Sequence, residues 1–185
     1  MFWISWWANC AQLNTSRYLY AGTISWYPSW STQKTFNRWA NYISRTSSQY
    51  CWSLYGSSSS LRTYFRIGSS TDSTNPNYPW IYSNWSSIYS SWNRPDWTWK
   101  NYVVVFDGTK TYMYINWVKL GEATFSWATN LPTSSEPFVI WRRTTGDTSY
   151  QVDTHCLSRF IIEDISWTEK DILKYFKKTK KIFWL

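Results

Sequence analysis

Residues 99–117 read WKNYVVVFDGTKTYMYINW, and this stretch decides the fold class. Its first half is rich in β-branched and aromatic residues, which favour a strand. Asp107-Gly108 is a hairpin signal, because glycine readily adopts the positive φ of a tight turn. Residues 111–115 and 118–122 then predict two further strands on either side of a turn at Asn116-Trp117. The stretch therefore predicts a three-stranded antiparallel meander.

Short strands separated by turns are predicted along the rest of the chain. The candidates are 22–27, 41–45, 51–55, 61–67, 80–82, 138–141 and 157–166. One helix is predicted at 168–178, with Thr168 as its N-cap and lysines in its last turn. This order of elements predicts an all-β fold, a two-sheet antiparallel jelly-roll sandwich with a short C-terminal helix. We expect one domain over residues 1–178, followed by a basic and apolar tail at 179–185.

The net charge of +8 arises from 19 basic and 11 acidic residues, and much of the excess lies near the end of the chain. The clustered lysines are Lys170, Lys174, Lys177, Lys178, Lys180 and Lys181. A solvated tail and a contact with an anionic surface both fit them. Basic residues before Lys110 are scattered, so no nucleic-acid partner is expected. No apolar run reaches 18 residues, so we expect no membrane span.

Tryptophan is in large excess and glycine is scarce, with 17 and six residues respectively. Three tryptophans, Trp85, Trp97 and Trp117, follow Asn or Asp where a hairpin turn would carry glycine. One interpretation is a genetic code in which UGA specifies glycine but has been translated as tryptophan. The other is that all the tryptophans are genuine and form a sugar-stacking surface.

Other tryptophans divide between the two interpretations by context. Five lie in places that indicate loops or strand ends: Trp30, Trp39, Trp92, Trp127 and Trp141. Four stand in strand-like or helix-start contexts that favour an aromatic residue: Trp26, Trp52, Trp99 and Trp167. The coding DNA would decide between the interpretations.

The segment from Trp99 to Phe176 resembles the concanavalin A-like lectin/glucanase superfamily, in its laminin-G-like branch. The resemblance rests on residues 99–108 (WKNYVVVFDG), 112–117 (YMYINW) and 160–172 (FIIEDISWTEKDI). Trp117 departs from the family pattern, which has glycine after the asparagine. The resemblance implies a curved sandwich, often appended to secreted, surface or pilus-type proteins that bind glycans or proteins.

Catalytic residues are not identified. Glycoside hydrolases need two carboxyl groups flanking the scissile bond, but Glu163 and Asp164 are adjacent and should point to opposite faces of a strand. His155 is the only histidine, and it has no motif that would make it a general base. We therefore expect no enzyme activity. A divergent glycoside hydrolase of the same fold is the alternative.

Two sets of alternating residues are candidate ligand platforms. Arg62, Tyr64 and Arg66 share one face of a predicted strand, and Tyr112 and Tyr114 share a face of another. Aromatic rings beside hydrogen-bonding groups suit sugars, although ordinary cross-strand pairing also explains them. The resemblance further implies calcium as a candidate cofactor. Its candidate ligands are loop carboxylates, Asp72, Asp147 and Asp153.

These observations predict a non-catalytic extracellular or cell-surface module that recognises carbohydrate or a partner protein. The parent is expected to be a larger surface or pilus-like protein. Residues 1–11 (MFWISWWANCA) are apolar but lack the positive region of a signal peptide, so we expect any export segment to lie upstream. A purely structural spacer remains a further alternative, and the oligomeric state is not predicted.

Overall fold

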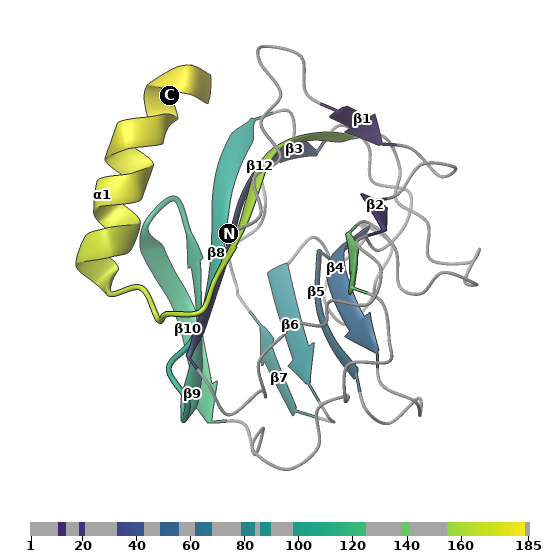
Figure 1. Cartoon of the computed structure of the whole chain (residues 1–185), viewed down its shortest axis with the longest axis vertical. Helices are drawn as coiled ribbons and strands as arrows, with labels where there is room; N and C mark the ends of the chain where they lie inside the picture. The colour runs from purple at the N-terminus through teal and green to yellow at the C-terminus, as the bar shows by residue number, and fades with distance from the viewer. Residues whose placement is uncertain are drawn as a thin grey trace.

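The computed structural model describes the backbone of residues 11–13, 19–20, 33–42, 49–55, 62–67, 79–83, 86–89, 98–124, 138–140 and 155–183. Side chains are described within residues 33–41, 65–66, 81, 98–124 and 159–183. These residues form two antiparallel sheets and one C-terminal helix (Figure 1). The all-β fold class predicted from the sequence is confirmed.

The two sheets, here called sheet A and sheet B, each contain six strands. Sheet A has the order β1 (Ala11–Leu13), β12 (His155–Glu163), β3 (Lys34–Tyr42), β8 (Trp99–Phe106), β9 (Lys110–Ile115) and β10 (Val118–Thr124). Sheet B has the order β2 (Leu19–Tyr20), β11 (Phe138–Ile140), β4 (Gln49–Tyr55), β5 (Arg62–Ile67), β6 (Pro79–Ser83) and β7 (Ser86–Tyr89). The chain crosses repeatedly between the sheets, as a jelly roll requires.

The predicted meander forms the β8–β9–β10 side of sheet A. Strand β8 pairs with β9 so that Val104 lies opposite Met113. Asn116 fastens the β9–β10 turn to β8, because it exchanges hydrogen bonds of 2.9 Å with the backbone of Asn101 in both directions. The turn is therefore held by a side chain as well as by the strand ladder.

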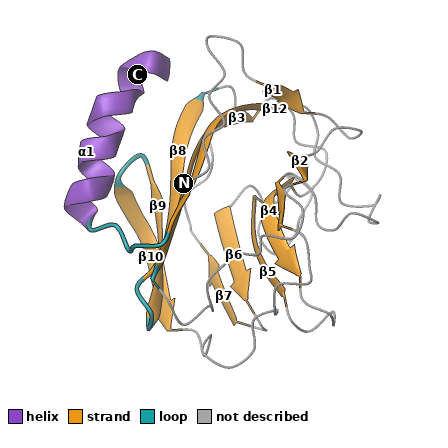
Figure 2. Ribbon diagram, viewed as in Figure 1, coloured by secondary structure: helices purple, strands orange, loops and turns teal. Residues whose placement is uncertain are grey.

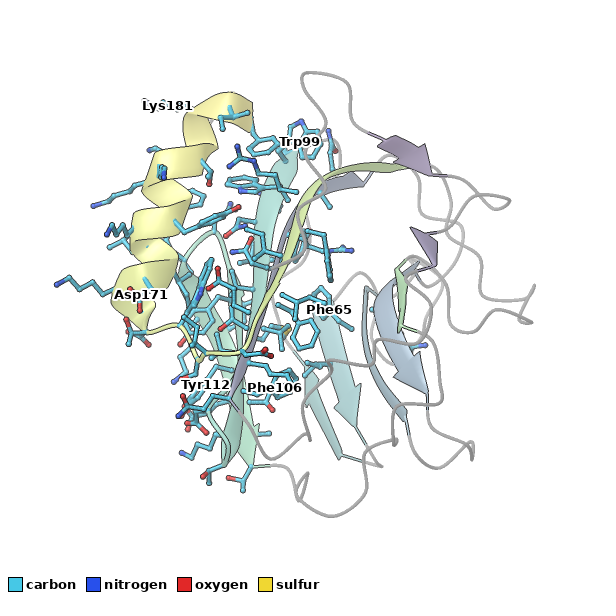
Figure 3. The ribbon with its side chains drawn as sticks, viewed as in Figure 1. Phe65, Trp99, Phe106, Tyr112, Asp171 and Lys181 are labelled. Carbon is cyan, nitrogen blue, oxygen red and sulfur yellow. The ribbon has the colours of Figure 1, made fainter. Side chains whose placement is uncertain are left out.

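Side chains from both sheets meet in the interior of the sandwich. Phe65 of β5 points toward sheet A (Figure 3). Its ring centroid lies 5.8 Å from that of Tyr102 of β8, and both rings are buried. The Arg38 guanidinium of β3 lies 5.6 Å from the Phe65 centroid and 5.3 Å from that of Tyr102. The two sheets thus pack face to face through aromatic contacts, with one cation between the rings.

Helix α1 (Glu169–Thr179) covers the opposite face of sheet A, and the 3-10 helix η2 (Lys180–Phe183) follows it (Figure 2). Ile172 is fully buried in one cluster with Val103, Val105 and Tyr114. Thr168 and Asp171 form a capping box at the start of α1. No helix among the described residues is long and apolar enough to cross a membrane.

Part of β3 was not predicted, and the prediction for Trp39 is wrong. The sequence indicated a strand at 41–45 and a loop or strand end at Trp39, whereas β3 runs from Lys34 to Tyr42. Trp39 is 0% exposed and lies in a cluster with Phe176 and Phe183. Polar residues are buried on both faces of this strand, so the polar and apolar alternation that identifies strands is absent.

One further strand was missed, and two further predictions are not tested by the structure. Strand β7 lies in a stretch after residue 82 where the sequence indicated a loop. The predicted strand at 22–27 lies outside the described residues. The domain boundary at residue 178 stays a prediction. Around it, Thr179 and Phe183 are both buried and the lysines between them are exposed.

Candidate functional site

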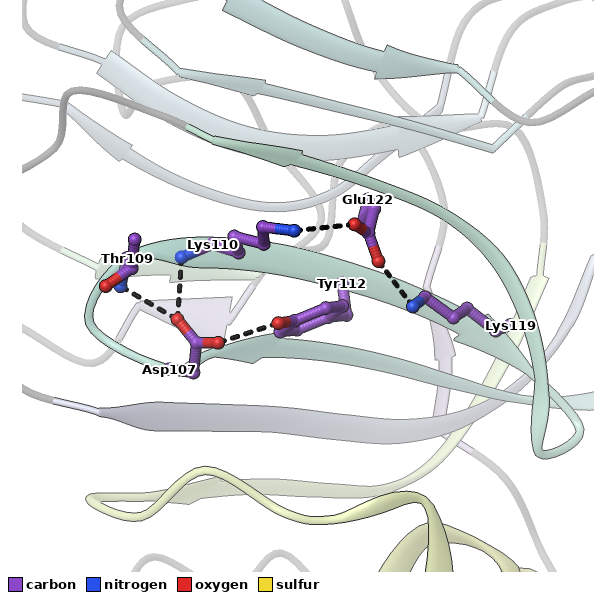
Figure 4. A network of polar contacts seen from close by, with 6 residues as sticks. All are labelled: Asp107, Thr109, Lys110, Tyr112, Lys119 and Glu122. Carbon is purple, nitrogen blue, oxygen red and sulfur yellow. Dashed lines mark hydrogen bonds and ion pairs between the residues drawn. The ribbon is translucent and has the colours of Figure 1, made fainter.

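A polar network joins the β8–β9 turn to strands β9 and β10, on the same face of sheet A as helix α1 (Figure 4). The Asp107 carboxylate accepts hydrogen bonds from the backbone N–H of Thr109 at 2.8 Å and of Lys110 at 2.6 Å. The Tyr112 hydroxyl donates to the other carboxylate oxygen of Asp107 at 2.7 Å. Partial burial opposes ionisation of Asp107, but these hydrogen bonds outweigh it and lower its pKa.

Glu122 completes this network. Its carboxylate accepts hydrogen bonds from the ammonium groups of Lys110 at 2.8 Å and Lys119 at 2.5 Å. These bonds, that of Lys110 first, lower the pKa of Glu122 to about 2. Lys119 also lies 4.8 Å from the centroid of the Tyr112 ring. The charges therefore neutralise one another, and neither Glu122 nor Asp107 has the raised pKa of a general acid.

The pair Tyr112 and Tyr114 is not a flat exposed platform. Tyr114 is only 4% exposed, because Ile172 of α1 packs on it, and its hydroxyl lies 3.5 Å from the Glu169 carboxylate. Burial first, and then the Glu169 charge, raise the pKa of Tyr114. Tyr112 is half-buried. The two residues do share a face, as the sequence indicated, but α1 occupies much of it.

The other predicted platform belongs to sheet B. In β5, Phe65 is buried and lies opposite Ile81 of β6, which is also buried, so these positions face the interior. Alternation then places Arg62, Tyr64 and Arg66 on the outer face. The register puts Tyr64 opposite Tyr82.

This outer face extends beyond the residues that the sequence identified. Further outer-face positions follow from the register with β4, β6 and β7, and they include Ser53, Tyr55, Trp80, Tyr82, Ser87 and Tyr89. Sequence reasoning missed them because local alternation shows which residues share a face of one strand but not which strands are neighbours. The short alternating run at 79–83 was the available signal. Sheet B therefore gathers aromatic, arginine and serine positions over four neighbouring strands.

The acidic pair at the end of β12, Glu163 and Asp164, has a structural role. Glu163 accepts a hydrogen bond of 2.6 Å from Trp167 Nε1, and Asp164 lies 3.3 Å from the ammonium group of Lys34. These contacts fix the segment that leads into α1. His155 pairs with Tyr42 in the strand ladder, and its side chain lies outside the described set.

The calcium prediction is not tested by the structure. Asp72, Asp147 and Asp153 all lie outside the described residues. Within the part of the chain that is described, no three Cys, His, Asp or Glu residues are grouped so as to hold a metal ion.

Trp117 adopts a backbone conformation that favours glycine. Its φ is 74°, that of Asn116 is 49°, and the Trp117 side chain is 49% exposed. Asparagine tolerates this left-handed region, but a bulky residue is an outlier there. Trp85 and Trp97 lie outside the described residues. Trp99 and Trp167, by contrast, pack against Phe183 and Tyr175 as aromatic residues do.

Comparison with known proteins gives structural neighbours only. No protein-family model matches the sequence. No curated protein matches it either.

Solved structures with the same fold include two from bacteria. A protein of Bacteroides ovatus, described as a candidate carbohydrate binding protein, has a TM-score of 0.66 and 16% identity over 85% of this chain and 43% of its own. Domain 4 of the extracellular arabinanase AbnA of Geobacillus stearothermophilus, solved in complex with arabinotriose, has a TM-score of 0.64 and 13% identity over 88% and 74%.

A third neighbour comes from a structure of botulinum neurotoxin type C, whose cell entry depends on two ganglioside molecules. Its TM-score is 0.58, with 15% identity over 81% of this chain and 36% of that chain. The present chain thus spans less than half the length of this neighbour and of the Bacteroides protein. At these identities the likeness establishes the β-sandwich fold alone.

Proposed function

We propose that this chain is a non-catalytic carbohydrate-binding module of the laminin-G-like branch, and that the outer face of sheet B holds the ligand. The single observation that carries the proposal is the register of β5 and β6. It places Tyr64 beside Tyr82 and, in the same row of β5, between Arg62 and Arg66. Tyrosine rings stack on the apolar faces of sugars, and arginines donate to their hydroxyl oxygens.

The comparisons support a binding role and an extracellular location. Among the neighbours, one is described as a candidate carbohydrate binding protein and another belongs to an extracellular arabinanase solved with arabinotriose. We propose that this module too acts outside the cell or on its surface, within a larger surface or pilus-like protein. A calcium ion held by Asp72, Asp147 and Asp153 remains part of this proposal, and a calcium titration monitored by calorimetry tests it.

The non-catalytic part of the proposal is supported by the state of the described carboxylates. The pKa values of Glu122 and Asp107 are lowered, because hydrogen bonds stabilise their ionised forms. A glycoside hydrolase needs one carboxyl group that stays protonated near neutral pH. Release of reducing ends from a panel of polysaccharides by the purified chain would instead establish the alternative, a divergent hydrolase.

The binding experiment compares the two sheets. A glycan array identifies oligosaccharides that bind the full chain, and calorimetry measures their affinity for the unmodified chain and for two variants. We expect the double variant Y64A/Y82A to lose at least about tenfold in affinity. Stacking of a sugar on one aromatic ring is worth on the order of 1 kcal/mol, and the variant removes two rings. Tyr112→Ala, on sheet A, should change affinity by less than about twofold.

Other results would count against the site. If Tyr112→Ala abolishes binding and Y64A/Y82A does not, the ligand lies on sheet A. If the array gives no hits, the spacer interpretation is favoured. The fold of each variant is checked by circular dichroism before binding is measured.

A further inference from the structure

Helix α1 carries a row of lysines on its solvent side. At about 100° per residue, Lys170, Lys174, Lys177 and Lys178 fall within an arc of about 100°, and all four are exposed. Lys181 follows in η2 and is also exposed. We call these five residues the α1 lysine row.

The row lies opposite the side of the helix that packs on sheet A. The buried residues of α1 are Ile172, Phe176 and Thr179. They lie about 180° around the helix from the middle of the row. Trp39 stacks with both Phe176 and Phe183, so the helix is fixed in its rotation. The lysines are therefore presented as a rigid line about 12 Å long from Lys170 to Lys178.

Among the described residues these charges are balanced only in part, because Asp171 interacts electrostatically with Lys174 and Lys170. None of the five lysines forms an ion pair within the residues that the structure describes, where the pairs found are those of Lys34, Lys110 and Lys119. The only acidic residues of α1, Glu169 and Asp171, are confined to its first turn.

The arrangement costs the helix stability. Lys170 with Lys174, Lys174 with Lys178, and Lys177 with Lys181 are like charges four residues apart, which repel each other on a helix. The helix dipole favours the lysines of the last turn, and Asp171 attracts Lys170 and Lys174, but neither effect removes the repulsion between the lysines. A line of positive charge in such excess is expected where an anionic partner neutralises it.

We propose that the α1 lysine row binds a linear acidic polysaccharide, such as a chain of uronic acids, at a surface separate from sheet B. A line of charges on one rigid helix matches a polymer with regularly spaced carboxylates. Lysine provides compact point charges rather than the paired donors of arginine, so recognition here follows charge density. A lipid surface fits less well, because the apolar side of α1 is used against sheet A and is not free to insert.

The test uses the full chain and polygalacturonate as the probe, with a neutral glucan for comparison. We expect binding to polygalacturonate that weakens as salt rises. Replacing all five lysines of the row by glutamine should abolish it, and replacement by arginine should retain it. Glutamine and arginine are both good helix formers, and the far-ultraviolet dichroism of each variant confirms that the helix remains.

A matched pair of variants separates the row from net charge. K174Q/K178Q and K110Q/K119Q each remove two charges, the second pair from the β9–β10 hairpin. We expect the first to weaken binding by about tenfold and the second by less than about twofold. Equal losses, or equal binding of the neutral glucan and polygalacturonate by a chain that carries Y64A/Y82A, would overturn the proposal.

Two further arms identify other partners. Tighter binding to vesicles of phosphatidylglycerol, or to a DNA duplex, than to polygalacturonate at the same salt would also refute a polysaccharide site. Because Y64A/Y82A leaves the row intact, its effect on neutral glycans reports on sheet B alone. The two proposals can therefore fail independently.

Discussion

The indole Nε1 of Trp39 donates a hydrogen bond of 3.1 Å to Thr179 Oγ1, and this bond joins the middle of sheet A to the last turn of α1. Both residues are buried. The rings of Phe176 and Phe183 lie nearly parallel to the indole, at centroid distances of 5.7 Å and 4.3 Å. The C-terminal helix is thus part of the core of sheet A.

Replacing Thr179 by valine should destabilise the protein by about 1–3 kcal/mol, because the buried Trp39 N–H would lose its acceptor. Thr179 also donates to the Tyr175 carbonyl at 2.8 Å, a bond that valine likewise removes. Thr179→Ser keeps the hydroxyl and should cost much less. Urea unfolding followed by tryptophan fluorescence measures both variants, and equal losses would show that the hydroxyl is not needed.

Trp117→Gly should stabilise the protein by about 1 kcal/mol, because it relieves a bulky residue at a φ of 74°. Trp117→Ala is the matched control. Alanine removes the ring but keeps the Cβ atom that is responsible for the strain, so it should give little gain. If the two variants have the same unfolding free energy, strain at this position is not significant.

The same position tests the reassigned-codon hypothesis. We expect codon 117 to be UGA in the gene, and Trp39, which is fully buried against Phe176 and Phe183, to be encoded by UGG. Sequencing the gene and determining the mass of the tryptic peptide from the native host decide this. A UGG codon at position 117 would end the hypothesis without affecting the strain prediction.

Local pattern predicted much of the fold. Residues 99–117 have clear alternation and turn signals, and α1 has a capping box and a single apolar side, so both were predicted within a few residues. The same signal failed for β3. In β3 the polar residues Asn37 and Lys34 are buried. Asn37 accepts a 3.0 Å hydrogen bond from Asn101, and Lys34 contacts Asp164, so these buried polar groups have partners.

The candidate site was predicted only in part. Alternation placed Tyr64 and its two arginines on one face of β5, and the burial of Phe65 agrees with that. That Tyr82 lies beside Tyr64, and that α1 covers Tyr114, depends on which distant segments become neighbours. No short-range pattern contains this information.

Acid should weaken the protein partly through Asp107. Hydrogen bonds in the folded state lower the pKa of Asp107 from its ordinary value of 3.8. Its contribution to stability is therefore complete above that value, and it is lost as the pH falls through the lowered pKa of the folded state. Asp107→Asn cannot titrate, so its deficit relative to the unmodified protein should shrink as the pH falls below the ordinary pKa of 3.8 and through the lowered pKa of the folded state.

Unfolding free energies of both proteins across this pH range measure the effect. Glu122→Gln serves as a second reference, because the pKa of Glu122 is also lowered, to about 2. It should show the same trend, although the two carboxylates share Lys110. A deficit for Asp107→Asn that does not change with pH would mean that Asp107 stabilises the turn equally in both protonation states.

Removing the N-cap of α1 should lower the stability of sheet A as well as that of the helix. Thr168 Oγ1 accepts a hydrogen bond from the Asp171 N–H at 3.2 Å, and the Asp171 carboxylate accepts one from the Thr168 N–H at 3.0 Å. Thr168→Ala removes the first bond and should cost about 1 kcal/mol. Because Ile172, one turn later, is buried against Val103, fraying of this turn would expose core surface rather than a free helix end. We therefore expect the loss in global unfolding measured by calorimetry, with Thr168→Ser close to the unmodified protein; a loss confined to local hydrogen exchange in α1 would mean that the helix unfolds separately from the sheet.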